Sequence, residues 1–197
     1  MTKIDYYFSL NSPWSFMGSA RLAEMAAKNG ATVNAVPVNL GAVFAETGGL
    51  PLPKRSPERQ AYRMMELKRW RAFNDIPLVL EPAHFPHDES EGVRLVFAAR
   101  QAGGDAHRLA TELGHMLWVE DRDPADASVQ NEAAQRVGLD ADALRSTLSA
   151  EESQTQWNKE TEDAIANGIF AAPSYVIDGE IFWGQDRLDF VERKLKG

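Results

Sequence analysis

The sequence contains no cysteine among its 197 residues. Thiol–disulfide exchange requires a protein thiolate as the attacking group, so the chain cannot act as a disulfide oxidoreductase. Proteins without cysteine are compatible with oxidising and with reducing compartments, and this absence therefore carries little information about location.

An excess of positive charge is also lacking. The chain has 21 Lys and Arg residues against 29 Asp and Glu residues, which gives a formal net charge of -8 at pH 7. Nucleic-acid binding depends on a basic stripe that contacts phosphates, and every group of basic residues here has acidic neighbours. We therefore expect a small molecule or a protein as the partner, and no nucleic acid.

Long apolar runs are missing as well, and none approaches the roughly 20 residues that a membrane span needs. The first residues do not show the basic segment and apolar stretch of a secretory signal. We expect a soluble, cytoplasmic protein without a membrane partner. A hydrophobic content of 44% over this length is sufficient for one sizeable core.

Periodicity and turn residues predict the order β, α, β, a long helical tract, then β, β, α. Gly and Pro residues between 48 and 57 mark the start of the helical tract, and Asp178-Gly179 marks a hairpin turn. The predicted strands are 4–8, 32–38, 174–177 and 180–183, and the predicted helices are about 13–29, 57–74, 89–102, 105–119, 126–137, 140–148, 151–166 and 186–194.

Two short segments at opposite ends of the chain are the most informative. Asn11-Ser12-Pro13-Trp14-Ser15 follows the first strand, and Ser12 and Ser15 have the spacing of the Cys-x-x-Cys motif in thioredoxin-type proteins. Near the other end, Ala171-Ala172-Pro173 precedes a strand, and Trp183-Gly184-Gln185-Asp186-Arg187 follows the next one. Together they predict a thioredoxin-type fold that has lost its cysteines.

These motifs resemble those of the glutathione-dependent 2-hydroxychromene-2-carboxylate isomerases and of the related kappa-class glutathione transferases. The resemblance implies an α/β protein of the DsbA type, with a thioredoxin-like domain at 1–45 and 168–197 and an inserted all-helical subdomain at 46–167. One difference is Gly48-Gly49, where the family carries an asparagine. Further similar segments are Leu40-Gly41-Ala42-Val43-Phe44, Pro82-Ala83-His84-Phe85-Pro86 and Trp118-Val119-Glu120.

The resemblance also implies a function. A homodimeric cis-trans isomerase would use glutathione to convert aromatic catabolites of the 2-hydroxychromene-2-carboxylate type, through reversible addition of the thiolate and rotation about a carbon–carbon bond. The nearest alternative is a kappa-class-like transferase that conjugates electrophiles with glutathione. An alternative of another class is a non-catalytic thioredoxin-like binding module or chaperone with a peptide groove around Pro173.

Ser12 is the candidate catalytic residue. A helix N-terminus favours an anion, and a serine hydroxyl there can donate a hydrogen bond to a thiolate. We expect Ser12 to lower the pKa of the glutathione thiol without acting as a nucleophile. The simpler interpretation is that Ser12 only caps the helix that begins at Pro13.

The candidate glutathione contacts follow from the resemblance. Pro173 is expected to be a cis-proline that exposes the backbone of Ala172 to the cysteinyl unit, although a trans proline at the start of a strand is the commoner state. Gln185 and Asp186 are expected to bind the γ-glutamyl end, and Arg187 to bind it or to orient Asp186. A capping aspartate and a solvated arginine are the simpler interpretation of the last pair.

The remaining candidates rest on side-chain chemistry. Lys54, or Arg55 beside it, can meet the glycyl carboxylate of glutathione as a cation. Trp14 and His84 are candidate substrate contacts, Trp14 as the wall of an aromatic pocket. His84, His87 and Asp88 lie close in sequence, but without an evident fourth ligand we expect no metal site.

Overall fold

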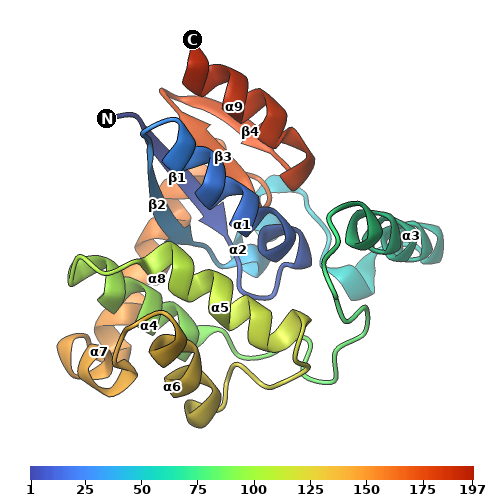
Figure 1. Cartoon of the computed structure of the whole chain (residues 1–197). Helices are drawn as coiled ribbons and strands as arrows, with labels where there is room; N and C mark the ends of the chain where they lie inside the picture. Colours follow the sequence, from blue (N-terminus) through green and yellow to red (C-terminus); the bar gives the residue numbers. More distant parts are fainter.

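The computed structural model describes residues 1–197 and contains one four-stranded sheet in the order β2-β1-β3-β4 (Figure 1). Strand β1 (Lys3–Phe8) pairs in parallel with β2 (Thr32–Pro37) and antiparallel with β3 (Ser174–Ile177). Strand β4 (Glu180–Trp183) is the antiparallel edge strand beside β3. The N-terminal strand β1 and the C-terminal strand β3 therefore lie side by side in the centre of the sheet.

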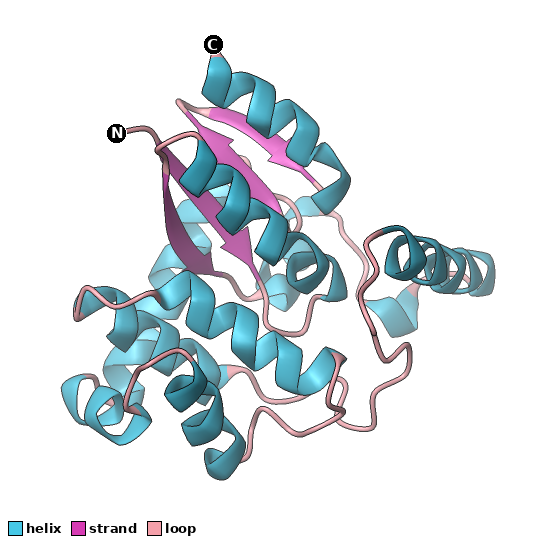
Figure 2. Cartoon of the chain, viewed as in Figure 1, coloured by secondary structure: helices cyan, strands magenta, loops and turns pink.

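Helices occupy most of the remaining chain (Figure 2). The long segment between β2 and β3 contains only helices and loops, as expected for a thioredoxin-like fold of the DsbA type with a helical insertion. The α-helices are α1 (Pro13–Lys28), α2 (Leu40–Thr47), α3 (Pro57–Phe73), α4 (Ser90–Gln101), α5 (Ala106–Trp118), α6 (Ala127–Arg136), α7 (Ala141–Thr147), α8 (Ala150–Ala166) and α9 (Leu188–Lys196), and the 3-10 turns are η1 (Leu52–Lys54) and η2 (Gln185–Arg187).

The predicted order of elements is confirmed, with two corrections. Helix α2 was not predicted, because its eight residues give too short a pattern; Asn39 caps its start and Gly48, with φ of 77°, ends it. The closing helix was expected from Asp186, but η2 comes first and α9 begins at Leu188. The reason is the sharp turn at Gly184, whose φ of 104° suits glycine and redirects the chain after β4.

The sheet is covered on both faces, because alternate residues of a strand point to opposite sides. Tyr6 of β1 belongs to the main core with residues of α1, α4, α5 and α9. Its neighbour Tyr7 packs on the other side, against a smaller cluster that includes Val43 of α2 and Ala164 of α8. This arrangement brings the start of α1, the start of β3 and the end of β4 to one edge of the molecule.

Helix α1 approaches η2 very closely. A Cβ atom at Gly18 would lie 2.8 Å from the Tyr175 hydroxyl and 2.9 Å from the Cβ of Gln185. Only glycine fits there without movement of a neighbour, so this small residue allows η2 to rest against α1. The turn that carries Asp186 is thereby held beside the helix that Ser12 begins.

A partly buried carboxylate fixes the loop between β1 and α1. The Ser9 hydroxyl donates to Glu89 Oε2 at 2.7 Å, and the Asn11 N–H donates to the same oxygen at 3.1 Å. Asn11 also exchanges two hydrogen bonds with the backbone of His87. Burial raises the pKa of Glu89, and the hydrogen bonds from Ser9 and Asn11 oppose that rise. The segment before α4 therefore holds the loop that leads to Ser12.

Helix α3 stands apart from the rest of the molecule (Figure 1). Leu67 is its only buried residue, and it packs against Met17, Leu78, Leu117 and Trp118. Because so little of α3 is buried, one side of this helix is free to form the wall of a cavity.

Candidate active site

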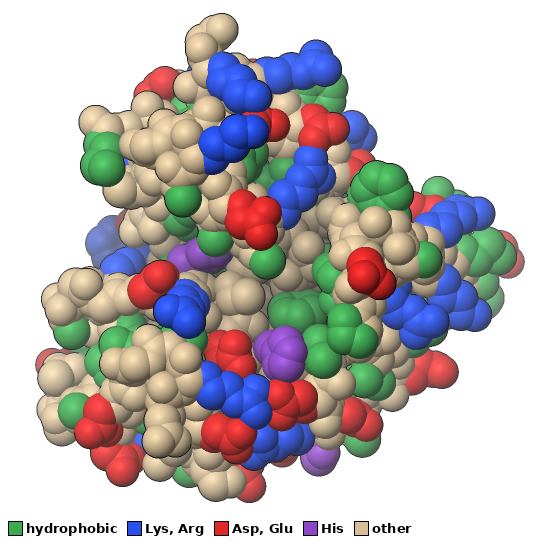
Figure 3. Space-filling view, viewed as in Figure 1, with side chains coloured by type: hydrophobic (Ala, Val, Ile, Leu, Met, Phe, Trp, Pro, Cys, Tyr) green, Lys and Arg blue, Asp and Glu red, His purple; other side chains and the backbone are tan.

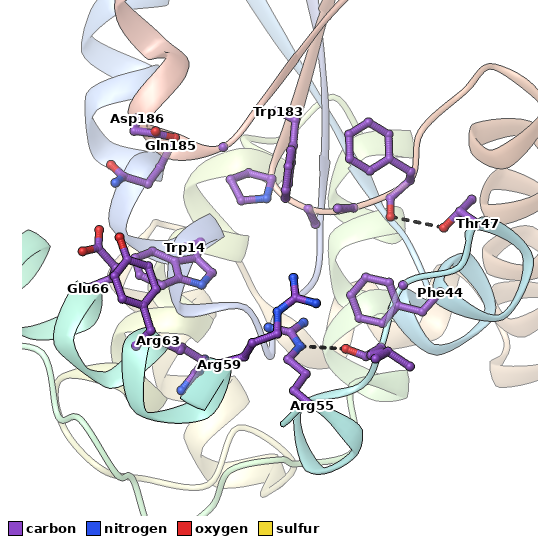
Figure 4. Close-up of a pocket in the computed structure, with 18 of the residues that line it drawn as sticks. Trp14, Phe44, Thr47, Arg55, Arg59, Arg63, Glu66, Trp183, Gln185 and Asp186 are labelled. Carbon is purple, nitrogen blue, oxygen red and sulfur yellow. Dashed lines mark hydrogen bonds between the residues drawn. The ribbon is translucent and has the colours of Figure 1, made fainter. Parts of the chain in front are cut away.

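A cavity of about 870 Å³ lies between the start of α1, the loop before β3, the turn after β4, α2 with its following loop, and α3 (Figure 4). Sites for small molecules typically have volumes of roughly 300–1,000 Å³, so this cavity is near the upper end of the range. It has room for an extended tripeptide and a small aromatic molecule together.

Most of the predicted site residues meet in this cavity although they come from opposite ends of the sequence. Trp14 contributes from α1, and the other five contribute from the C-terminal segment. The predicted residues that line the cavity are Trp14, Ala172, Pro173, Gln185, Asp186 and Arg187.

Ser12 lies at the N-terminal end of α1, two residues before Trp14, and is 6% exposed. It does not itself line the large cavity; its side chain borders a small void between α1 and α5. Its Oγ accepts the Ser15 N–H at 3.2 Å, which confirms the predicted N-cap. The Ser12 hydroxyl proton has no acceptor in the chain, and the Trp14 N–H has no acceptor either. Two donors are thus available at this helix end.

The peptide bond between Ala172 and Pro173 is cis, which confirms the expectation for Pro173. Neither the N–H nor the C=O of Ala172 forms a hydrogen bond within the chain. The neighbouring carbonyls are satisfied: Ala171 O accepts from the Ser174 hydroxyl, and Pro173 O accepts from the Gly184 N–H. The free N–H and the free C=O of this one residue can pair with the backbone of an extended peptide, as in strand addition.

Gln185, Asp186 and Arg187 form η2 at the cavity wall. Gln185 is 3% exposed, whereas the side chains of Asp186 and Arg187 are 40% and 52% exposed and form an ion pair at 3.4 Å. Asp186 therefore retains a carboxylate that an ammonium group can reach, and Arg187 is placed to orient it.

Lys54 and His84 are not brought into the cavity. Lys54 lies in η1 and is exposed, while its neighbour Arg55 lines the cavity. His84 lies in the loop after α3, with its Nδ1 3.7 Å from Asp123. Within the chain, no cluster of three or more His, Cys, Asp or Glu residues has the arrangement of a metal site.

Sequence reasoning missed a group of cationic residues on the α3 side, Arg59 and Arg63, which line the cavity together with Arg55. Their spacing of four residues was a usable signal, because residues four apart lie on one face of a helix. Arg55 donates to the Leu50 carbonyl at 2.8 Å and lies 6.0 Å from the centre of the Phe44 ring (Figure 4). Burial and the charge of Arg59 lower the pKa of Arg55.

Sequence reasoning also missed the aromatic rim of the cavity. Phe170 and Trp183 meet edge to face with ring centres 5.0 Å apart, and both are about half exposed. Gly49 is tightly packed, because a Cβ atom there would clash with the Phe44 ring. Glycine at this position thus lets the loop after α2 close over the Phe44 ring.

Comparison with known proteins gives consistent results. The model of the DsbA-like thioredoxin domain matches residues 3–196. A 2-hydroxychromene-2-carboxylate isomerase of Sphingobium xenophagum is 32% identical over 197 residues, with 99% of each chain covered. Glutathione S-transferase kappa 1 of Caenorhabditis elegans is 36% identical over 83 residues, which cover 42% of this chain and 36% of the transferase. A solved structure of a 2-hydroxychromene-2-carboxylate isomerase superposes with a TM-score of 0.83 at 25% identity and covers 98% of this chain and 94% of its own.

Proposed function

This chain belongs to the DsbA-like thioredoxin family and within it to the 2-hydroxychromene-2-carboxylate isomerases, and from this premise we propose that it is a glutathione-dependent isomerase of 2-hydroxychromene-2-carboxylate-type aromatic compounds. The observation that carries the proposal is the unpaired backbone of Ala172, which faces the same cavity as the start of α1 and η2. A thiol peptide bound along Ala172 would have its sulfur near the start of α1, the helix that Ser12 caps.

The residues present fit glutathione along its length. Asp186 and the start of η2 suit the γ-glutamyl ammonium and carboxylate, Ala172 suits the cysteinyl backbone, and Arg55 suits the glycyl carboxylate. We assign the last contact to Arg55 rather than Lys54, because Arg55 faces the cavity. When bound, glutathione supplies a nucleophilic thiolate for reversible addition to the substrate.

The chain's own residues prepare the thiol and form the apolar side of the substrate pocket. Ser12 and the free N–H of Trp14 stabilise negative charge at the end of α1. Trp14 provides an apolar wall for the ring of the substrate. An isomerase of this kind leaves glutathione unconsumed, whereas a transferase of the kappa class converts it into a conjugate.

The proposal is tested by calorimetry with glutathione and with S-methylglutathione, followed by product analysis with 2-hydroxychromene-2-carboxylate. We expect saturable binding of glutathione, weaker binding of the methylated form, and isomerisation with the total thiol unchanged. No binding of glutathione at millimolar concentration would exclude the proposal, and loss of free thiol during turnover would favour the transferase.

Asp186→Ala is expected to weaken glutathione binding by about tenfold. A hydrogen bond to a charged group contributes about 1.5–3 kcal/mol, and the exposure of Asp186 places its contribution at the lower end. Calorimetry measures the change, and Asp189→Ala, an exposed aspartate of α9 outside the cavity, is the matched control. Equal affinity in the Asp186 variant and the parent protein would remove the γ-glutamyl assignment.

The state of assembly and the location stay predictions. No helix in the structure is both long enough and apolar enough to cross a membrane. From the resemblance to dimeric enzymes and the prevalence of twofold oligomers, we expect a homodimer in the cytoplasm. Light scattering over a wide range of concentration tests the dimer, and a monomer mass throughout would exclude it.

A further inference from the structure

The α3 wall of the cavity carries positive charge that no carboxylate neutralises. Eight of the other eleven arginines of this acidic protein form ion pairs, for example Arg100 with Glu160 and Arg136 with Glu120. Arg55, Arg59 and Arg63 form no ion pair. On the face shown in Figure 3, Lys and Arg side chains gather over α3, whereas over α5 and α6 they alternate with Asp and Glu.

The carboxylates of the same cavity are engaged elsewhere or point to water. Glu66 pairs with Arg69, which lies outside the cavity lining, and Asp186 pairs with Arg187. Glu58 lies in the first turn of α3, where its own N–H and the Ser56 hydroxyl lower its pKa. An anion that enters the cavity therefore meets arginines that have no competing partner.

The three arginines occupy different parts of the wall. Arg55 is tied to the α2 end through Leu50 and Phe44. Arg63 lies at the opposite end, with its guanidinium 5.8 Å from the centre of the Phe85 ring. Phe85 packs against the same buried cluster as Trp14, which places Arg63 at the end of the cavity where α1 begins. Arg59 projects into the space between the two ends (Figure 4).

Burial makes the charge of Arg63 costly when it is unpaired. Desolvation and the charge of Arg55 both lower the pKa of Arg63, although a guanidinium stays protonated at neutral pH. A carboxylate bound to Arg63 would relieve this cost, and the planar guanidinium can bind both carboxylate oxygens. Trp14, Tyr62 and Trp70 line the cavity at this end and offer aromatic faces to a flat ring.

We propose that Arg59 and Arg63 form a carboxylate subsite for the second ligand, and that this subsite makes the enzyme selective for anionic aromatic compounds. The inference rests on the proposed function, in which Arg55 serves glutathione. The aromatic ring lies against Trp14, and the carboxylate binds to the two arginines of α3. Neutral electrophiles lack the group that this wall recognises, so they bind weakly.

The test uses chromone-2-carboxylate, a flat unreactive aromatic acid, and chromone-2-carboxamide, its neutral counterpart of the same shape. Binding is measured by calorimetry and by quenching of tryptophan fluorescence, without and with saturating glutathione. We expect the acid to bind at least tenfold more tightly than the amide, because one charge-assisted contact of about 1.4 kcal/mol corresponds to a tenfold change in affinity.

Arg59→Gln and Arg63→Gln are each expected to weaken binding of the acid by roughly tenfold and to leave the amide unchanged. Arg63→Lys retains the positive charge but lacks the planar guanidinium. Its affinity for the acid should lie between those of the parent and Arg63→Gln. Lys68→Gln is the matched control, because it removes one exposed charge from α3 outside the cavity. Glutathione affinity should be the same in all these variants, which also shows that they are folded.

The outcomes separate this inference from the proposed function. Equal affinity for acid and amide, an equal loss for both in the arginine variants, or a loss of acid binding in Lys68→Gln would overturn the subsite while glutathione binding stands. If Arg59→Gln and Arg63→Gln weaken glutathione instead of the acid, the assignment to the second ligand is wrong. If the parent binds no glutathione, the proposed function fails, and selective binding of the acid through Arg59 and Arg63 still supports the subsite.

Discussion

Ser12→Ala is expected to raise the pKa of the bound glutathione thiol by about one to two units and to reduce turnover near neutral pH by tenfold or more. The Ser12 hydroxyl proton has no acceptor in the chain and is available to a thiolate. A lost charge-assisted hydrogen bond of about 1.5–3 kcal/mol corresponds to a shift of this size. Glutathione affinity should change little, because Ala172, Asp186 and Arg55 bind other parts of the peptide.

The ultraviolet absorbance of the bound thiolate, followed against pH, measures this shift directly, and turnover at alkaline pH should recover in part. Ser15→Ala is the matched control, since the Ser15 hydroxyl is buried and has no hydrogen-bond partner. Coincident titration curves for the parent and Ser12→Ala would show that Ser12 only caps α1. The Trp14 N–H and the helix end would then stabilise the thiolate alone.

The second large effect concerns stability in acid. His107 is 7% exposed, its Nε2 lies 2.8 Å from the Ser19 hydroxyl, and burial lowers its pKa to about 4. The unfolded chain takes up a proton near pH 6.5, whereas the folded chain resists protonation until about pH 4. Stability from this residue is therefore complete above pH 6.5 and is lost as the pH falls towards 4. Between pH 7 and pH 5 the loss is about 2 kcal/mol.

Urea denaturation at pH 7 and pH 5 checks this expectation. His107→Gln should be less stable than the parent at pH 7 by about 1 kcal/mol, through the hydrogen bond to Ser19, but should lose about 2 kcal/mol less on acidification. The loss that remains includes the share of His87, whose pKa burial also lowers to about 4. His84→Gln serves as the control, because the His84 side chain is exposed and its Nδ1 lies 3.7 Å from Asp123. If the parent and His107→Gln lose the same stability between the two pH values, the buried imidazole does not cause the acid sensitivity.

Local sequence determined the parts of the site that depend on a few neighbouring residues. The cap at Ser12 with Pro13, and the hairpin turn at Asp178-Gly179, arise from contacts within about four residues, so their patterns can be read directly. The motif around Pro173 was informative for another reason. Its resemblance to a known family indicated that it lies beside the segment around Ser12 at the start of the chain. Patterns among neighbouring residues do not contain this information.

Only the tertiary structure decided which cations face the cavity. Lys54 and Arg55 are adjacent in sequence and chemically similar, and the loop after α2 turns only Arg55 inward. The direction of Arg59 and Arg63 depends on how α3 sits against the body of the protein. Because Leu67 is the only buried residue of α3, the helix has no strong apolar stripe from which its orientation could be predicted.

The hydrogen bonds that fix the loop between β1 and α1 could not be predicted from the sequence either. Glu89 is 78 residues from Asn11, and the hydrogen bond between them exists because the segment before α4 returns to the end of β1. The same holds for His107 and Ser19, which are 88 residues apart. Caps and turns are encoded locally because their energy comes from neighbouring atoms, whereas contacts of this kind depend on the packing of whole helices against the sheet.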